Sequence, residues 1–149
     1  MDKENMKRTF PCYRNADGTI LFDKSMLPVA AQQQDFENVY RLCLNGKLNS
    51  DSFLCTYLDK FNIRDRDLSD SGTFSTSCFN KIRGVKQCLK FMRRNHPNVI
   101  VAKGSIKIDS GFSYLDKPKT GHIHWWIFVE EKPEDYFSII KEGELNENN

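Results

Sequence analysis

Two histidines at the start of one apolar segment are the side chains best suited to chemistry. His122 and His124 flank a single isoleucine in the run 122–129, whose sequence is HIHWWIFV. In a strand, alternate residues point to the same face, and at a rise of roughly 3.3 Å per residue their Cα atoms lie about 7 Å apart. Imidazoles at this spacing can move a proton or bind a ligand, so His122 and His124 are candidate catalytic residues. The alternative is a structural pair that is bonded to backbone or carboxylate groups.

A metal ion is the weaker interpretation of the same histidine pair. A metal site needs a third ligand, and His96 is the one other histidine in the chain. An aspartate or a glutamate would have to complete the set, and we therefore expect no metal here. Glu130 is the first carboxylate after the apolar run, and it joins the two histidines as a candidate catalytic residue.

A hydroxyl-rich segment is the second candidate. Ser75, Thr76 and Ser77 are consecutive within residues 73–79, whose Phe and Thr content favours an extended strand. Hydroxyls in such a strand commonly bond the backbone, and no Gly-x-Ser-x-Gly sequence surrounds them to support a serine nucleophile. The chain also has no GxGxxG, P-loop or HExxH sequence, which excludes standard dinucleotide-fold dehydrogenases, P-loop NTPases and zincin proteases.

The segment from Lys81 to Lys107 contains eight Lys or Arg residues and no acid. If residues 80–94 form a helix, most of these cations gather on one flank, because successive residues are rotated by about 100°. A nucleic-acid backbone can bind such a flank, and the alternative is a solvated surface balanced by the acidic C-terminus. The nucleic-acid candidates are Arg83, Lys86, Lys90, Arg93 and Arg94.

The order of these segments resembles that of bacterial ADP-ribosyltransferase toxins over about residues 38–130. The matching pieces are Val39-Tyr40-Arg41, then Ser52-Phe53-Leu54, then the Ser-Thr-Ser run before Cys78. In that family an arginine on the first strand contacts the phosphates of NAD, and a Ser-Thr-Ser strand organises the cleft. The resemblance implies that Arg41 and the hydroxyls of Ser75, Thr76 and Ser77 bind NAD. It places His122-Ile-His124 where the family has a Gln/Glu-x-Glu with the catalytic glutamate.

The rest of the sequence predicts one α+β domain with a mixed, mainly antiparallel sheet and three to four helices. Residues 35–44 fit both a helical stripe and an alternating strand, and the resemblance implies the strand. Residues 109–121 are expected to be a long loop. We expect helices at about 50–61, 80–94 and 133–140, and an N-terminal hairpin with its turn at 15–18 and a strand at 19–22. Strands are expected at 73–79 and 122–129, and residues 98–108 are expected to form a strand pair or one bent strand.

Length and composition set wider limits. The 149 residues carry a net charge of +2, although residues 130–149 alone carry −5. We predict one domain over residues 1–141 and an acidic disordered tail over residues 142–149. No apolar run is long enough for a membrane span and the N-terminus has no apolar leader, so we expect a cytoplasmic protein without a membrane partner. The five cysteines have no CxxC spacing and are expected to be reduced thiols.

These observations lead to one main hypothesis and two alternatives. The main hypothesis is a bacterial, toxin- or defence-associated protein, similar to ADP-ribosyltransferases, that binds NAD or a related nucleotide between the Arg41 strand and the Ser75–Ser77 strand. Whether it is an active transferase stays open at this point. One alternative is a nucleic-acid-binding module that uses the basic face from Lys81 to Lys107. The other is an immunity- or inhibitor-type protein that binds a protein partner.

Overall fold

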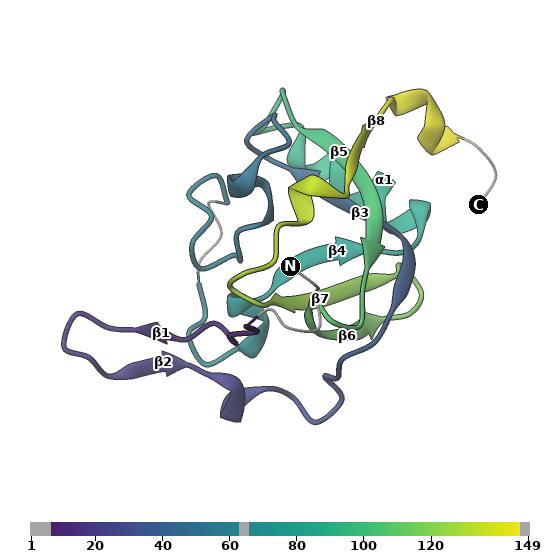
Figure 1. The fold of residues 1–149 in the computed structure, drawn as a ribbon. Coiled ribbons are helices and arrows are strands. Elements are labelled where there is room, and N and C mark those ends of the chain that lie inside the picture. Colours follow the sequence, from purple (N-terminus) through teal and green to yellow (C-terminus); the bar gives the residue numbers. More distant parts are fainter. Residues whose placement is uncertain (1–6, 63–65, 147–149) are drawn as a thin grey trace.

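A six-stranded antiparallel sheet forms the body of the computed structural model, which describes residues 7–62 and 66–146 (Figure 1). The strand order is β6-β7-β4-β3-β5-β8, and every neighbouring pair is antiparallel. The antiparallel sheet and the α+β class agree with the prediction. The strands are β3 (Phe36–Cys43), β4 (Thr76–Phe79), β5 (Ile100–Ile106), β6 (Gly111–Lys117), β7 (His122–Ile127) and β8 (Ser138–Ile140).

A separate hairpin extends from the sheet near the N-terminus, as Figure 1 shows. Its strands are β1 (Tyr13–Arg14) and β2 (Ile20–Phe22), which confirms the hairpin predicted from the intervening turn residues. The buried ring of Phe22 stacks on Phe74 with centroids 4.9 Å apart, and Trp126 of β7 belongs to the same aromatic cluster. This cluster holds the hairpin against the end of β7.

The prediction of three to four helices is wrong. The described residues contain one α-helix, α1 (Ile82–Met92). Where a helix over 50–61 was expected, there is only a 3-10 turn, Ser50–Phe53. Beyond this turn, the backbone N–H groups of Thr56 and Tyr57 donate to the carbonyls of Ser75 (3.2 Å) and Thr73 (2.8 Å). Because these N–H groups donate to residues distant in the sequence, they cannot form the local hydrogen bonds of a helix.

The expected helix over 133–140 and the expected loop over 109–121 are both replaced by strands. Only Pro133–Asp135 forms a 3-10 turn, after which β8 pairs with β5 at Val101 and Ile140. β-branched isoleucines in β8 suit this role at the open edge of β5. Within the expected loop, β6 forms a hairpin with β7, and Ser113 of β6 is fully buried opposite Trp125.

The sheet is covered by apolar side chains on both faces. On one face, Ile82, Val85 and Leu89 of α1 pack against Tyr40 and Val101. The other face is a core built from β3, β4, β5 and β7, in which burial raises the pKa of the Cys78 thiol to about 12. The buried core residues of this second face include Val39, Cys43, Cys78, Ala102, Ile123, Trp125 and Phe137.

The C-terminal segment is partly packed. Residues 142–146 of the expected tail form a 3-10 helix, and Leu145 is 2% exposed against the α1 cluster. Residues 147–149 lie outside the described part of the chain. With 11 residues, α1 is too short to cross a bilayer, and the described residues contain no other helix that could do so.

The junction of β3 and β4 shapes the region where the candidate residues lie. Both strands are fully described, and they are paired with each other at one position, Tyr40 with Phe79. β5 pairs with the other edge of β3, and β7 pairs with the other edge of β4. The carbonyl of Ser77 is therefore left without a ladder partner from β3. Arg41, which follows Tyr40, supplies the missing donor: its Nη1 lies 2.9 Å from this carbonyl oxygen.

Gly84 allows α1 to approach the turn between β6 and β7. A Cβ atom at this position would lie 2.1 Å from the carbonyl oxygen of Thr120 and 2.6 Å from Cδ1 of Phe79. We predict that Gly84→Ala lowers the free energy of unfolding by about 1–3 kcal/mol, because the added methyl overpacks a backbone contact. Alanine normally stabilises a helix interior relative to glycine by about 1 kcal/mol. A decrease in the free energy of unfolding, rather than an increase, would therefore indicate the close backbone contact.

Urea unfolding of the purified variant tests this prediction for Gly84. The control is Lys86→Ala, an exposed change in the same helix that is expected to stay within about 0.5 kcal/mol of wild type. A Gly84→Ala protein as stable as wild type, or more stable, would show that the helix and the turn do not pack this closely.

Candidate functional site

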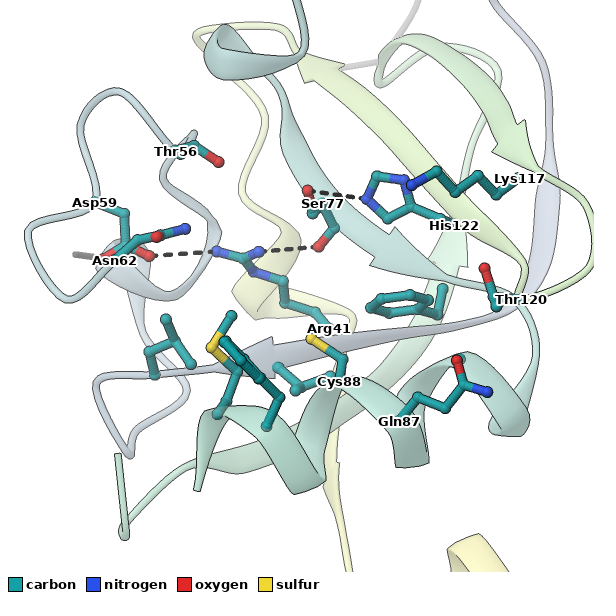
Figure 2. Close-up of a pocket in the computed structure, with 16 residues that line it drawn as sticks. Arg41, Thr56, Asp59, Asn62, Ser77, Gln87, Cys88, Lys117, Thr120 and His122 are labelled. Atoms are coloured by element: carbon teal, nitrogen blue, oxygen red, sulfur yellow. Dashed lines mark hydrogen bonds and ion pairs between the residues drawn. The ribbon is translucent and has the colours of Figure 1, made fainter. Parts of the chain in front are cut away.

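A cavity of about 400 Å³ lies beside the junction of β3 and β4 (Figure 2). It is bordered by α1, by the loop that contains Thr56 and Asp59, and by the turn between β6 and β7. Three residues predicted from the sequence line it, each from a different strand: Arg41 of β3, Ser77 of β4 and His122 of β7. The antiparallel sheet thus brings together side chains that are far apart in the chain.

The guanidinium of Arg41 is bonded to the protein on all three nitrogens. Nε donates to the carbonyl of Ser52 (2.8 Å), Nη1 to that of Ser77 (2.9 Å) and Nη2 to that of Leu54 (3.3 Å). Nη2 also lies 3.7 Å from Oδ2 of Asp59, and both residues of this pair are buried. Figure 2 shows Arg41 between the Asp59 loop and Ser77. The main role of Arg41 is therefore to hold this loop against β4, rather than to bind phosphate with a free guanidinium.

The two serines face the two histidines, whereas the threonine between them does not. Ser75 Oγ lies 2.8 Å from His124 Nδ1, and Ser77 Oγ lies 3.2 Å from His122 Nε2. In the β4–β7 register Ser77 is opposite His124 and Phe79 is opposite His122, so each serine contacts the histidine diagonally across the strand pair. Thr76 points to the other face and donates from Oγ1 to a backbone carbonyl of the preceding 3-10 turn at 2.7 Å. Of the three hydroxyls, only that of Ser77 lines the cavity.

Asp116 is the site residue that the sequence analysis missed. It lies at an irregularity in the β6–β7 pairing, between Leu115 and Lys117. Its Oδ2 atom is 3.2 Å from His124 Nε2 and 3.5 Å from His122 Nδ1. One ligand atom from each of these three residues can be chosen so that all lie within 4.8 Å of one another, close enough to hold a metal ion. In the sequence, Asp116 could have been recognised as the carboxylate that precedes the histidines by one short turn.

His122 is held as a neutral imidazole. Burial, with a smaller contribution from neighbouring His124, lowers its pKa to about 4, although the opposite charge of Asp116 acts in the other direction. Among the described residues its Nδ1 atom is buried without a hydrogen-bond partner. A base whose pKa lies this far below 7 is a weak proton acceptor near neutral pH. His122 is better suited to accept a hydrogen bond or to coordinate an ion.

Glu130, the third candidate catalytic residue, lies beyond the far end of β7 and does not line the cavity. Its carboxylate accepts hydrogen bonds from the hydroxyl and the backbone N–H of Thr9, and these bonds lower the pKa of Glu130. The structure therefore separates Glu130 from His122 and His124. Its visible role is to hold the N-terminal segment against the end of β7.

The basic side chains of α1, with Arg93 and Arg94 just beyond its end, form a solvent-exposed flank. Nη2 of Arg93 forms a 2.7 Å ion pair with Glu142 from the acidic C-terminal segment. Lys86 and Lys90 border the same shallow hollow as Glu142 and buried Leu145. Part of the flank is thus already neutralised by the chain itself, and binding of a nucleic acid here stays a prediction. All five candidates, Arg83, Lys86, Lys90, Arg93 and Arg94, are exposed.

The candidate residues fall into three groups. Arg41, Ser77 and His122 line the cavity. Ser75 and His124 are hydrogen-bonded to each other outside its lining, and Asp116 lies next to both His124 and His122. Thr76 and Glu130 point elsewhere. Compared with protein-family models, curated proteins and solved structures, the chain matches none of them.

Proposed function

We propose that this protein binds a nucleotide, NAD or a related molecule that contains ADP-ribose, in the cavity beside β3 and β4. The observation that carries the proposal is the meeting of Arg41, Ser77 and His122 at one cavity. Arg41 and Ser77 are residues that carry the resemblance to ADP-ribosyltransferases, and His122 stands where that family has its Gln/Glu-x-Glu. Their convergence supports the nucleotide hypothesis over the nucleic-acid alternative, because the basic flank of α1 shows no comparable cavity and is in part paired with Glu142.

The lining of the cavity suits a molecule with a flat apolar part and a polar part. Its volume of about 400 Å³ lies within the usual range for small-molecule sites, about 300–1,000 Å³. Phe79 and Phe91 offer aromatic surface for a base, and Lys117 offers a cation. The other apolar lining residues are Leu42, Leu44 and Met92, and the other polar ones include Thr56, Asn62, Gln87 and Thr120.

The geometry changes the roles that the resemblance implies. Because its nitrogens already bond three carbonyls, Arg41 builds the wall of the cavity, and Lys117 is the cation that we assign to phosphate. His122 contributes an uncharged ring to the wall of the cavity, next to the hydroxyl of Ser77. Transfer of ADP-ribose would need a carboxylate beside the anomeric carbon to stabilise positive charge. The carboxylate that lines the cavity, Asp59, is already paired with Arg41, so the proposal is nucleotide binding without a transfer step.

Lys117 provides the sharpest test, because Lys119 offers a matched control in the same turn. Both side chains are exposed, but only Lys117 lines the cavity. We predict that Lys117→Ala weakens binding of NAD or ADP-ribose about tenfold or more, since a hydrogen bond to a charged group contributes about 1.5–3 kcal/mol. Lys119→Ala should bind as wild type does. Isothermal titration calorimetry with NAD, ADP-ribose and AMP measures the three affinities.

Two results would contradict the nucleotide proposal. One is the absence of heat or thermal stabilisation with every nucleotide at millimolar concentration. The other is an equal loss of affinity in Lys117→Ala and Lys119→Ala, which would indicate nonspecific attraction of an anion by the turn. Release of nicotinamide from NAD during the same incubation would show that the protein also cleaves the glycosidic bond.

A further inference from the structure

We propose that Asp116, His122 and His124 form a binding site for a divalent transition-metal cation, with zinc as the best-matched ion. This goes beyond nucleotide binding and does not depend on it, because the three side chains surround a point of their own next to the cavity. His122 borders both places, whereas Asp116 and His124 do not line the cavity.

Two of the distances between donor atoms match a tetrahedral ion, and all three donor atoms lie within 4.8 Å of one another. Zinc bonds nitrogen and oxygen ligands at about 2.0–2.2 Å, so neighbouring ligands of a tetrahedron lie about 3.3–3.6 Å apart. Oδ2 of Asp116 is 3.2 Å from His124 Nε2 and 3.5 Å from His122 Nδ1. Two imidazole nitrogens and one carboxylate oxygen are also a usual set of protein ligands for zinc, with a fourth position open to water or to a bound molecule.

A hydrogen bond on the opposite side of the His124 ring determines which of its nitrogens faces Asp116 with a lone pair. The hydroxyl of Ser75 donates to the carbonyl of Gly72 at 2.8 Å, so the same oxygen accepts from Nδ1–H of His124 at 2.8 Å. In the tautomer with its proton on Nδ1, His124 carries its lone pair on Nε2, 3.2 Å from the carboxylate of Asp116. Two acceptors at 3.2 Å repel each other unless a positive charge lies between them.

His122 lies between the other serine of this strand and the same carboxylate. Its Nε2 atom lies 3.2 Å from the hydroxyl of Ser77, and its buried Nδ1 atom faces Asp116 without a hydrogen-bond partner in the described residues. In metal sites, histidine ligands commonly use the second ring nitrogen for a bond that orients the ring. Ser75 and Ser77 would have this orienting role for the two histidines. The Ser-Thr-Ser segment would then serve the metal site as well as the cavity.

Titration of EDTA-treated protein with zinc tests the proposal without any nucleotide. We expect one zinc ion per chain by calorimetry and a rise in the melting temperature. We also expect cobalt, a spectroscopic substitute, to give the visible absorption of a tetrahedral site without a thiolate charge-transfer band. Asp116→Asn keeps the size of this half-exposed side chain, so it should fold, and it should weaken zinc binding more than about 100-fold. Ser75→Ala should weaken it by roughly 10–100-fold.

His96→Gln is the matched control, because His96 is outside the cluster and should not affect zinc affinity. Circular dichroism checks that each variant is folded. The proposal is overturned if folded wild-type protein binds no zinc, or if Asp116→Asn binds it as tightly as wild type. It is also overturned if a proton replaces the ion: His124 would then stay doubly protonated by NMR at neutral pH while zinc leaves its spectrum unchanged. Loss of zinc binding in Asp116→Asn with unchanged NAD affinity would separate this site from the proposed nucleotide site.

Discussion

Replacing Arg41 with alanine is expected to lower the free energy of unfolding by about 3–5 kcal/mol, the usual cost of removing one partner from a buried ion pair. The change removes the ion-pair partner of the buried Asp59 carboxylate and deprives the carbonyls of Ser52, Ser77 and Leu54 of their donor. An unsatisfied buried polar group costs about 1–3 kcal/mol. Because a domain of this kind is stable by only about 5–15 kcal/mol, the variant should be only marginally folded.

Arg41→Lys separates charge from geometry. Lysine keeps the positive charge opposite Asp59, but a single ammonium group cannot reproduce the planar fork that reaches three carbonyls. We expect it to recover only part of the lost stability. Arg94→Ala, an exposed change beyond the end of α1, should stay within about 0.5 kcal/mol of wild type.

Urea unfolding followed by tryptophan fluorescence measures all three Arg41 and Arg94 variants. If Arg41→Ala were within about 1 kcal/mol of wild type while losing NAD binding, the guanidinium would contact ligand rather than hold the loop. That result would restore the phosphate role that the resemblance implies and would contradict the assignment of Lys117.

Trp125→Ala is expected to be the most destabilising change in β7, at about 3–5 kcal/mol. The side chain is fully buried, between the ring of Phe53 at 6.3 Å and that of Phe137 at 6.0 Å. Its Nε1–H donates to the hydroxyl of Ser110 at 3.1 Å. The variant therefore loses a large apolar surface, leaves a cavity and removes the donor to a buried hydroxyl.

Trp125→Phe and Ile139→Ala are the controls for this prediction. Phenylalanine keeps the aromatic contacts and loses the hydrogen bond, so it should cost less than alanine. Ile139 is 56% exposed on β8, and its truncation should change stability by no more than about 0.5 kcal/mol. A Trp125→Ala protein with near-native stability would mean that this face of β7 is not packed as the structure places it.

Several features of the fold could be predicted because they depend on neighbours in the sequence. The hairpin of β1 and β2 follows from the turn residues between them, and α1 follows from its apolar stripe. The alternation in β7 is also local. It places His122 and His124 on one face and Ile123 and Trp125 in the core on the other.

Other features depend on hydrogen-bond partners that are distant in the sequence. The apolar stripe of residues 50–61 has helical spacing, yet its backbone donors bond Ser75 and Thr73, and its carbonyls accept from Arg41. The isoleucines of β8 fit a helix or a strand until the open edge of β5 is known. Periodicity shows which side chains are apolar, but not which distant backbone group will take a hydrogen bond.

Residue types alone therefore determined that two imidazoles share a face, that hydroxyls alternate on a strand, and that the chain has one α+β architecture. Tertiary structure decided how these groups act. It placed Asp116 between the two histidines, turned Ser75 and Ser77 toward them, enclosed Arg41 among three carbonyls and moved Glu130 away. The physical reason is that strand alternation is local, whereas a site needs a register between strands, and register depends on pairing across the whole sheet.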